Sequence, residues 1–63
     1  MTTTFIVTFT AGAEPFFSHH TDTCEFVEID ADGNEVFEMT TDRPSALATD
    51  LDCNDAVVSY REM

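Results

Sequence analysis

The first part of the chain alternates between large apolar residues and their neighbours. Between residues 4 and 10, Phe5, Val7 and Phe9 occupy every second position, and the residues between and beside them are threonine or isoleucine. A period of two in a stretch rich in aromatic and β-branched residues is typical of a half-buried strand. The pattern predicts a strand over residues 4–10.

A second alternating pattern surrounds a cluster of turn-forming residues. Residues 24–30 and 35–41 are both rich in apolar residues at alternate positions, and Asp32, Gly33 and Asn34 lie between them. These three residue types favour tight turns, because their backbones tolerate positive φ or their side chains bond to the local backbone. We predict a β-hairpin.

Two registers fit this hairpin. A three-residue loop at 32–34 places four apolar side chains on one face, which we expect to be the core face: Val27, Ile29, Phe37 and Met39. The same loop places Glu28 opposite Glu38 on the other face, flanked by Asp30 and Phe26. A two-residue loop at 32–33 instead places Val27 opposite Glu38, and the pattern leaves both registers open.

The second half of the chain predicts one helix and a closing strand. Asp42 is a candidate N-cap, and Pro44 suits the first helical turn because its φ is already fixed near the helical value. Leu47 and Leu51 lie one turn apart and would face a sheet. In the closing strand, over 56–62, Val58 and Tyr60 fall on one side and Val57 on the other.

These elements predict a single domain over residues 1–63, of the α+β class. It consists of a small antiparallel β-sheet of about four strands with one short helix packed on one face. The order along the chain is strand, strand, strand, helix, strand. Residues 11–23 predict a loop in which Pro15 opens a short helical turn.

Charge is more informative about function than any motif in this sequence. The chain has 13 acidic residues against Arg43 and Arg61, and its formal net charge is -11. With 43% hydrophobic residues it is too apolar for the composition of a disordered chain. Such a charge repels nucleic acids and anionic membranes. We therefore expect a basic protein surface as the partner, with no direct nucleic acid binding and no membrane.

The acidic residues concentrate in two places. The predicted hairpin carries the main candidate patch for partner binding, which consists of Glu25, Glu28, Asp30, Asp32, Glu35 and Glu38. A second group, at the predicted end of the helix, consists of Asp50, Asp52 and Asp55. Acids at a helix C-terminus oppose the helix dipole, which suggests a use other than stability.

Two aromatic residues in a polar loop are a further candidate. Phe16 and Phe17 follow Pro15 in the predicted loop. They either close over the core or form an exposed apolar anchor inside an acidic rim, as in interface hot spots.

We expect no catalytic residue, metal or cofactor. Cys24 and Cys53 each adjoin a carboxylate, which disfavours a reactive thiolate. Histidines 19 and 20 lie near Asp22 and Cys24, but no second ligand pair completes a zinc site. The alternating acids of the hairpin turn match a calcium loop only in part, because Glu35 occupies the place of its required glycine.

The chain resembles the small, acidic, phage-encoded inhibitors of host defence, notably anti-CRISPR proteins that act as DNA mimics. The resemblance rests on size, charge and composition, and on acids spread over most of the chain: Glu14, Asp22, Glu25, Glu28, Asp30, Asp32, Glu35, Glu38, Asp42, Asp50, Asp52, Asp55 and Glu62. It implies an inhibitor that binds a basic, DNA-receiving surface of a CRISPR effector complex, with type I favoured, and blocks target DNA.

The resemblance also implies a cytoplasmic location in the host bacterial cell. The start of the chain lacks the pattern of a signal peptide, and two cysteines kept reduced agree with that location. Two other interpretations stay open. The composition is similar to that of small halophilic domains, and it also suits an acidic subunit or antitoxin that binds a basic protein.

Overall fold

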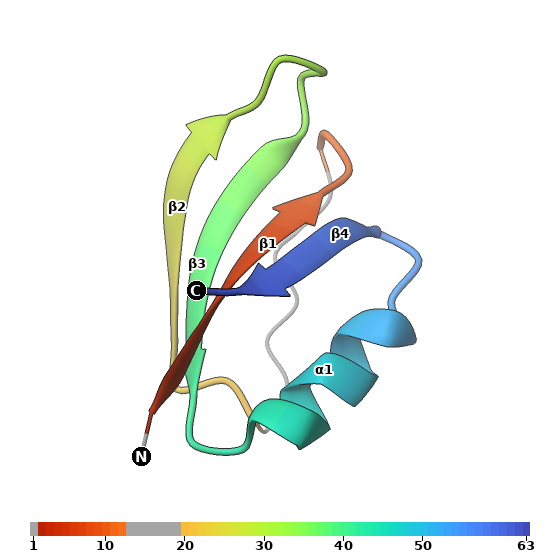
Figure 1. The fold of residues 1–63 in the computed structure, drawn as a ribbon. Helices are drawn as coiled ribbons and strands as arrows, with labels where there is room; N and C mark the ends of the chain where they lie inside the picture. Colours follow the sequence, from red (N-terminus) through yellow and green to blue (C-terminus); the bar gives the residue numbers. More distant parts are fainter. Residues whose placement is uncertain (1, 13–19) are drawn as a thin grey trace.

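The computed structural model describes residues 2–12 and 20–63. The elements in chain order are β1 (Thr3–Phe9), β2 (Thr23–Ile29), β3 (Glu35–Thr41), α1 (Pro44–Asp52) and β4 (Val57–Glu62). All neighbouring strands are antiparallel, in the order β2-β3-β1-β4 (Figure 1). The predicted α+β class and order of elements are confirmed, and the expected short helical turn at Pro15 lies outside the described residues.

The first strand forms the centre of the sheet. β1 lies between β3 and β4, and the side chains of Phe5, Val7 and Phe9 are exposed by 5%, 0% and 0%. This strand has the most regular alternation in the sequence, and a central position lets it bury every second side chain. The alternation therefore predicted the core residues of β1 correctly.

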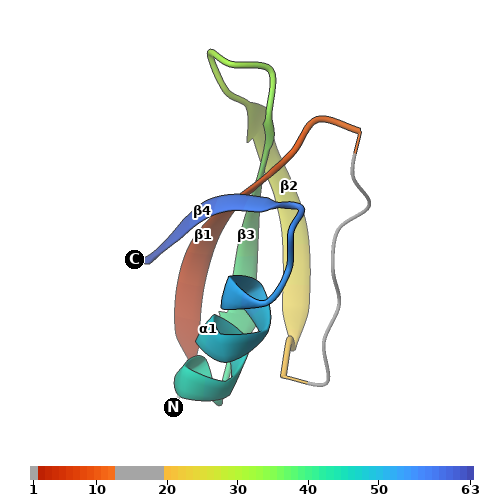
Figure 2. The ribbon, with the colours of Figure 1, turned by 90° about the vertical axis from the view of Figure 1, so that its right-hand side faces the viewer.

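One helix covers one face of the sheet. Pro44 begins α1 as predicted, but the N-cap is Arg43 rather than Asp42, and no side chain caps the helix. The Arg43 backbone N–H is instead bonded at 2.9 Å to the Thr41 hydroxyl oxygen, which lies at the end of β3. Figure 2 shows α1 in front of the sheet. No helix in residues 2–12 and 20–63 is long and apolar enough to cross a membrane.

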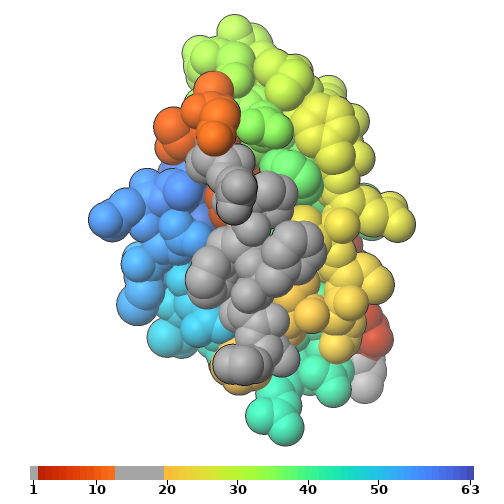
Figure 3. Space-filling view, turned by 180° about the vertical axis from the view of Figure 1, so that it is seen from behind, coloured from red at the N-terminus to blue at the C-terminus, as the bar shows by residue number. Residues whose placement is uncertain are grey.

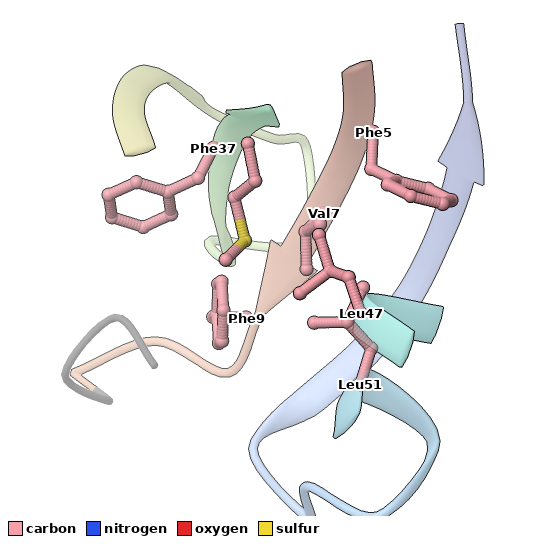
Figure 4. Close-up of a cluster of buried hydrophobic side chains, with 7 residues drawn as sticks. Phe5, Val7, Phe9, Phe37, Leu47 and Leu51 are labelled. Atoms are coloured by element: carbon pink, nitrogen blue, oxygen red, sulfur yellow. The ribbon is translucent and has the colours of Figure 1, made fainter. Parts of the chain in front are cut away.

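The core lies between α1 and the two central strands. Phe9 and Phe37 meet edge to face with ring centres 5.5 Å apart, and Phe5 meets Tyr60 in the same way at 5.9 Å. Such contacts add to the stability gained from burial alone. The buried cluster, drawn in Figure 4, consists of Phe5, Val7, Phe9, Phe37, Met39, Leu47 and Leu51.

The pairing of β4 with β1 contains an irregularity. Ser59 lies opposite Thr8 and Val57 opposite Phe9, so that Val58 has no partner on β1. The alternation along β4 changes phase at this point. Val57 packs against the core while Val58 is 55% exposed, and the prediction that Val58 shares a face with Tyr60 is wrong.

Candidate functional site

The turn of the acidic hairpin differs from both predicted registers. Its loop consists of residues 31–33, because the Asp30 N–H donates to the Asn34 carbonyl at 2.9 Å. Gly33 adopts φ 85°, a conformation that glycine reaches without a Cβ penalty. The Asp30 Oδ1 accepts the backbone N–H groups of Asp32 and Asn34, both at 2.9 Å. Two more backbone donors are thereby satisfied, and this carboxylate stabilises the turn.

A bulge in β2 determines where each of its side chains points. Phe26 lies opposite Phe37 and Glu28 opposite Val36, so Val27 is an extra residue without a partner on β3. Glu25, which lies opposite Glu38, and Glu28 therefore share one face of the sheet although they are three positions apart. Strict alternation would have put these two glutamates on opposite faces.

The same bulge brings apolar residues together on the opposite face. Phe26 and Ile29 lie on the side of the sheet that α1 covers, and the Phe26 ring meets Phe37 edge to face at 5.6 Å. The prediction for the core face is therefore wrong in part, because Phe26 was expected on the other side and Ile29 lies on the expected side but is not buried. Phe37 is buried as expected, but Val27 is 47% exposed and Ile29 55% exposed.

The glutamates belong to the side of the sheet opposite α1, which we call the open face. Its central row runs across four strands, from Glu25 through Glu38 and Ile6 to Arg61. The neighbouring row has Glu28 on β2 and uncharged residues on the other strands. The open face thus carries carboxylates along β2 and β3 and uncharged residues along β1.

Electrostatic repulsion acts within this group. Glu25 and Glu38 lie directly opposite, on strands spaced about 4.8 Å apart, and such a pair destabilises a sheet by about 0.2–1 kcal/mol. Arg61 lies two strands from Glu38, about 10 Å away across the sheet. Within the described part of the chain, no salt bridge reaches Glu25, Glu28 or Glu38. We call these three residues the carboxylate triad.

The structure divides the predicted hairpin patch into three parts. Glu25, Glu28 and Glu38 form the triad, whereas Asp30 and Asp32 belong to the turn at the end of the hairpin. Glu35 lies opposite Ile29, on the other face, and its Oε2 accepts the Gly12 N–H at 3.1 Å. The expected pairing of Glu28 with Glu38 is wrong, and Glu25 takes that place because of the register.

The second acidic group is engaged in contacts within the fold. Asp50 Oδ2 lies 2.9 Å from the Nδ1 atom of His20, and Asp52 accepts the Tyr60 hydroxyl at 2.7 Å. Asp55 is exposed in the turn before β4. Two shallow hollows flank the end of α1, one lined by Asp52 and the other by Asp50 and Asp55. These contacts give two of the three aspartates a role in holding the fold.

The bond between Asp52 and Tyr60 has a measurable consequence. The hydrogen bond to Asp52 raises the pKa of Tyr60, and partial burial and the aspartate charge act in the same direction. The neutral phenol therefore stabilises the fold at pH values below the ordinary tyrosine pKa, near 10, and this contribution is lost as pH rises through the higher folded pKa. Asp52→Ala should lower the pKa of Tyr60 towards its ordinary value.

Ultraviolet absorbance of the phenolate during an alkaline titration measures this pKa, since the chain has one Tyr and no Trp. Asp55→Ala is the matched control, because it removes a nearby carboxylate that has no contact with Tyr60. Superimposable titration curves for the parent and Asp52→Ala would show that the bond has no such effect.

The exposed apolar side chains of β2 were not predicted. Phe26, Val27 and Ile29 are 55%, 47% and 55% exposed, and we call them the β2 apolar cluster. The predicted anchor, Phe16 and Phe17, lies outside the described residues. One feature of the sequence could have indicated the bulge in β2. Glu25 and Glu28 are three positions apart, as are Phe26 and Ile29, and like residues at a spacing of three fit a bulged strand better than a regular one.

The two cysteines are free thiols that differ in their exposure. Burial raises the pKa of the half-buried Cys24 thiol, which disfavours the nucleophilic thiolate. Cys53 is the C-cap residue that follows α1 and is exposed. His19 lies outside the described residues. Within residues 2–12 and 20–63, no group of three metal-ligating side chains is close enough to hold an ion.

Comparison of this chain with models of protein families, with curated proteins and with solved structures found no significant match.

Proposed function

We propose that this protein is a noncatalytic inhibitor that binds the basic, DNA-receiving surface of a CRISPR effector complex, with type I complexes favoured. It blocks target DNA by imitating the charge of a nucleic acid backbone. It acts in the cytoplasm of a bacterial host cell and needs no cofactor. The carboxylate triad on the open face, Glu25, Glu28 and Glu38, is the observation that carries the proposal.

The physical basis is competition for the same positive charges. A surface that receives DNA uses Lys and Arg side chains to neutralise phosphates, and this supplies most of its sequence-independent affinity. Carboxylates on neighbouring strands present closely spaced negative charges to such side chains. The net charge of -11 adds a long-range attraction towards any basic channel.

The repulsion inside the triad favours a partner over a merely solvated face. Glu25 and Glu38 oppose each other in the free protein, and no cationic side chain in residues 2–12 and 20–63 forms a salt bridge with either of them. A Lys or Arg placed between them would relieve this repulsion and form charge-assisted hydrogen bonds. Part of the binding free energy then comes from relief of the repulsion between Glu25 and Glu38, which is present only in the unbound state.

An acidic subunit or antitoxin is the second candidate function. The β2 apolar cluster favours it, because apolar anchors beside charges are common where one protein binds another and are not required for imitation of DNA. In that case the basic partner would not need to bind nucleic acid. Competition by DNA for the partner distinguishes the two functions, because DNA should displace a DNA mimic from its partner but need not displace a subunit or antitoxin.

The decisive experiment is an order-of-addition assay with purified type I effector complex and labelled target DNA. We expect the protein to prevent DNA binding when it is added first, and to bind poorly when DNA already occupies the channel. The affinity of the protein for the complex should fall steeply as salt rises, since several ionic contacts are made at once.

Two results would overturn the proposal. One is simultaneous binding of protein and DNA to the effector, and the other is an affinity that salt does not change. Capture of a basic partner that DNA cannot displace would instead support the subunit or antitoxin function. Loss of the fold in dilute buffer would point to a halophilic domain, whose acidity needs no partner.

A further inference from the structure

β2 is an edge strand whose side chains lie mostly in solvent. No described strand pairs with its outer side, and six of its seven residues are exposed. The N–H and C=O groups on the free side of an edge strand can pair with another chain. In Figure 3 the atoms of β2, drawn in yellow, form one rim of the molecule.

The two sides of β2 differ in chemistry. Glu25 and Glu28 lie on the open face, and Phe26 and Ile29 lie on the opposite face. The bulge at Val27 causes this separation, because it shifts the alternation of side chains along β2 by one residue. β4, the other edge strand, has no such separation: it carries both Arg61 and Glu62 and exposes one large apolar side chain. An added strand would therefore meet a charged side and an apolar side only at β2.

A second copy of this protein fits the edge poorly. Antiparallel pairing of two β2 strands would bring the glutamates of both copies together, and like charges across a strand pair are destabilising. Each copy also carries a net charge of -11. Charges on an edge strand are one device that prevents unselective pairing, and here Glu25 and Glu28 oppose an acidic strand while leaving a basic one free to bind.

We infer that β2 accepts an extended segment of a basic partner as a fifth strand, in which apolar and basic side chains alternate. The basic side chains of that segment lie over Glu25 and Glu28, and its apolar side chains contact Phe26 and Ile29. Backbone pairing supplies affinity, and the alternation supplies specificity. The inference rests on the proposed function, for which it names the mode of binding.

The probe is a peptide in which Val and Lys alternate over about eight residues. We expect it to shift the backbone amide signals of Thr23–Ile29 in nuclear magnetic resonance spectra and to slow amide exchange there. A peptide of equal composition, with Val and Lys in two blocks, should bind at least about tenfold more weakly, which corresponds to the loss of about 1.4 kcal/mol.

Methylation of the peptide backbone tests the strand pairing directly. In one version every Val nitrogen is methylated, and in a second version every Lys nitrogen. Antiparallel and parallel pairing turn opposite edges of the peptide towards β2, so methylation of the edge used in the preferred direction should weaken binding more than methylation of the other edge.

Side-chain variants test the apolar side. Phe26→Ser and, separately, Ile29→Ser should each weaken the alternating peptide at least about tenfold, as removal of a central anchor does. Val58→Ser is the matched control, because Val58 is also 55% exposed but lies on the other edge strand. It should leave the affinity unchanged.

The outcomes separate this inference from the proposed function. Equal binding of the alternating and block peptides, insensitive to methylation, would refute strand addition while supporting capture of basic groups by the carboxylates. No binding of the alternating peptide, or a free protein already paired through β2, would also refute strand addition. The order-of-addition assay would then decide the proposed function by itself.

Discussion

Leu47→Ala is expected to leave most molecules unfolded at physiological temperature. Leu47 is completely buried, and it projects from the single helix into the cluster formed by β1 and β3. Truncation of a buried leucine costs about 2–5 kcal/mol, from lost burial and from the cavity that remains. The free energy of unfolding of a domain of this size is rarely more than about 3–5 kcal/mol, so this one substitution removes most of it.

Thermal and urea unfolding followed by circular dichroism measure this effect. Val58→Ala is the control, because the 55% exposed Val58 side chain has little contact to lose and should change stability by no more than about 0.5 kcal/mol. If Leu47→Ala unfolds at nearly the same temperature as the parent protein, the packing of α1 against the core does not contribute substantially to stability.

Reversal of two charges on β2 is expected to abolish high-affinity binding to the basic partner. The double variant Glu25→Lys, Glu28→Lys replaces two attractive contacts with repulsive ones, and we expect a loss of about 100-fold or more in low salt. Its fold should be as stable as the parent or more stable, because the lysine introduced at position 25 would face Glu38 across the strands and replace a repulsive pair with an attractive one.

The control must have the same net charge. Asp42→Lys, Glu62→Lys changes the charge equally at two exposed residues outside the carboxylate triad and β2. Effector binding is compared at about 50 mM and 200 mM salt, a range over which ionic contacts weaken strongly. Equal losses in the two double variants would mean that net charge, and not this site, determines binding.

The core could be predicted where alternation is regular. Phe5, Val7 and Phe9 in the central strand, and the pair Leu47 and Leu51 in the helix, are all buried as expected. Each of these sets follows the period of its own element, so local pattern and final position agree. The start of the helix was less predictable, because Arg43 takes the N-cap position in place of Asp42, and its backbone N–H is bonded to the Thr41 hydroxyl at the end of the preceding strand.

The candidate site could be predicted only in part. The sequence identified the acidic hairpin and its glutamates, but it paired Glu28 with Glu38 where the fold pairs Glu25 with Glu38. Strict alternation also assigned Val27 and Ile29 to the core, whereas both are exposed. One residue inserted into a strand reverses the direction of every later side chain, and a sequence does not mark the position of that insertion.

Three properties follow from the sequence alone: the class of the fold, the core residues of the central strand and the helix, and the large negative charge. These properties depend on local periodicity and on composition. The three-dimensional structure was needed to show that Glu25, Glu28 and Glu38 share the open face, and that Phe26 and Ile29 lie exposed on the other side. The reason is that strand register and the bulge at Val27 are set by how β2 pairs with β3 across the hairpin, and the alternation along β2 alone does not specify that pairing.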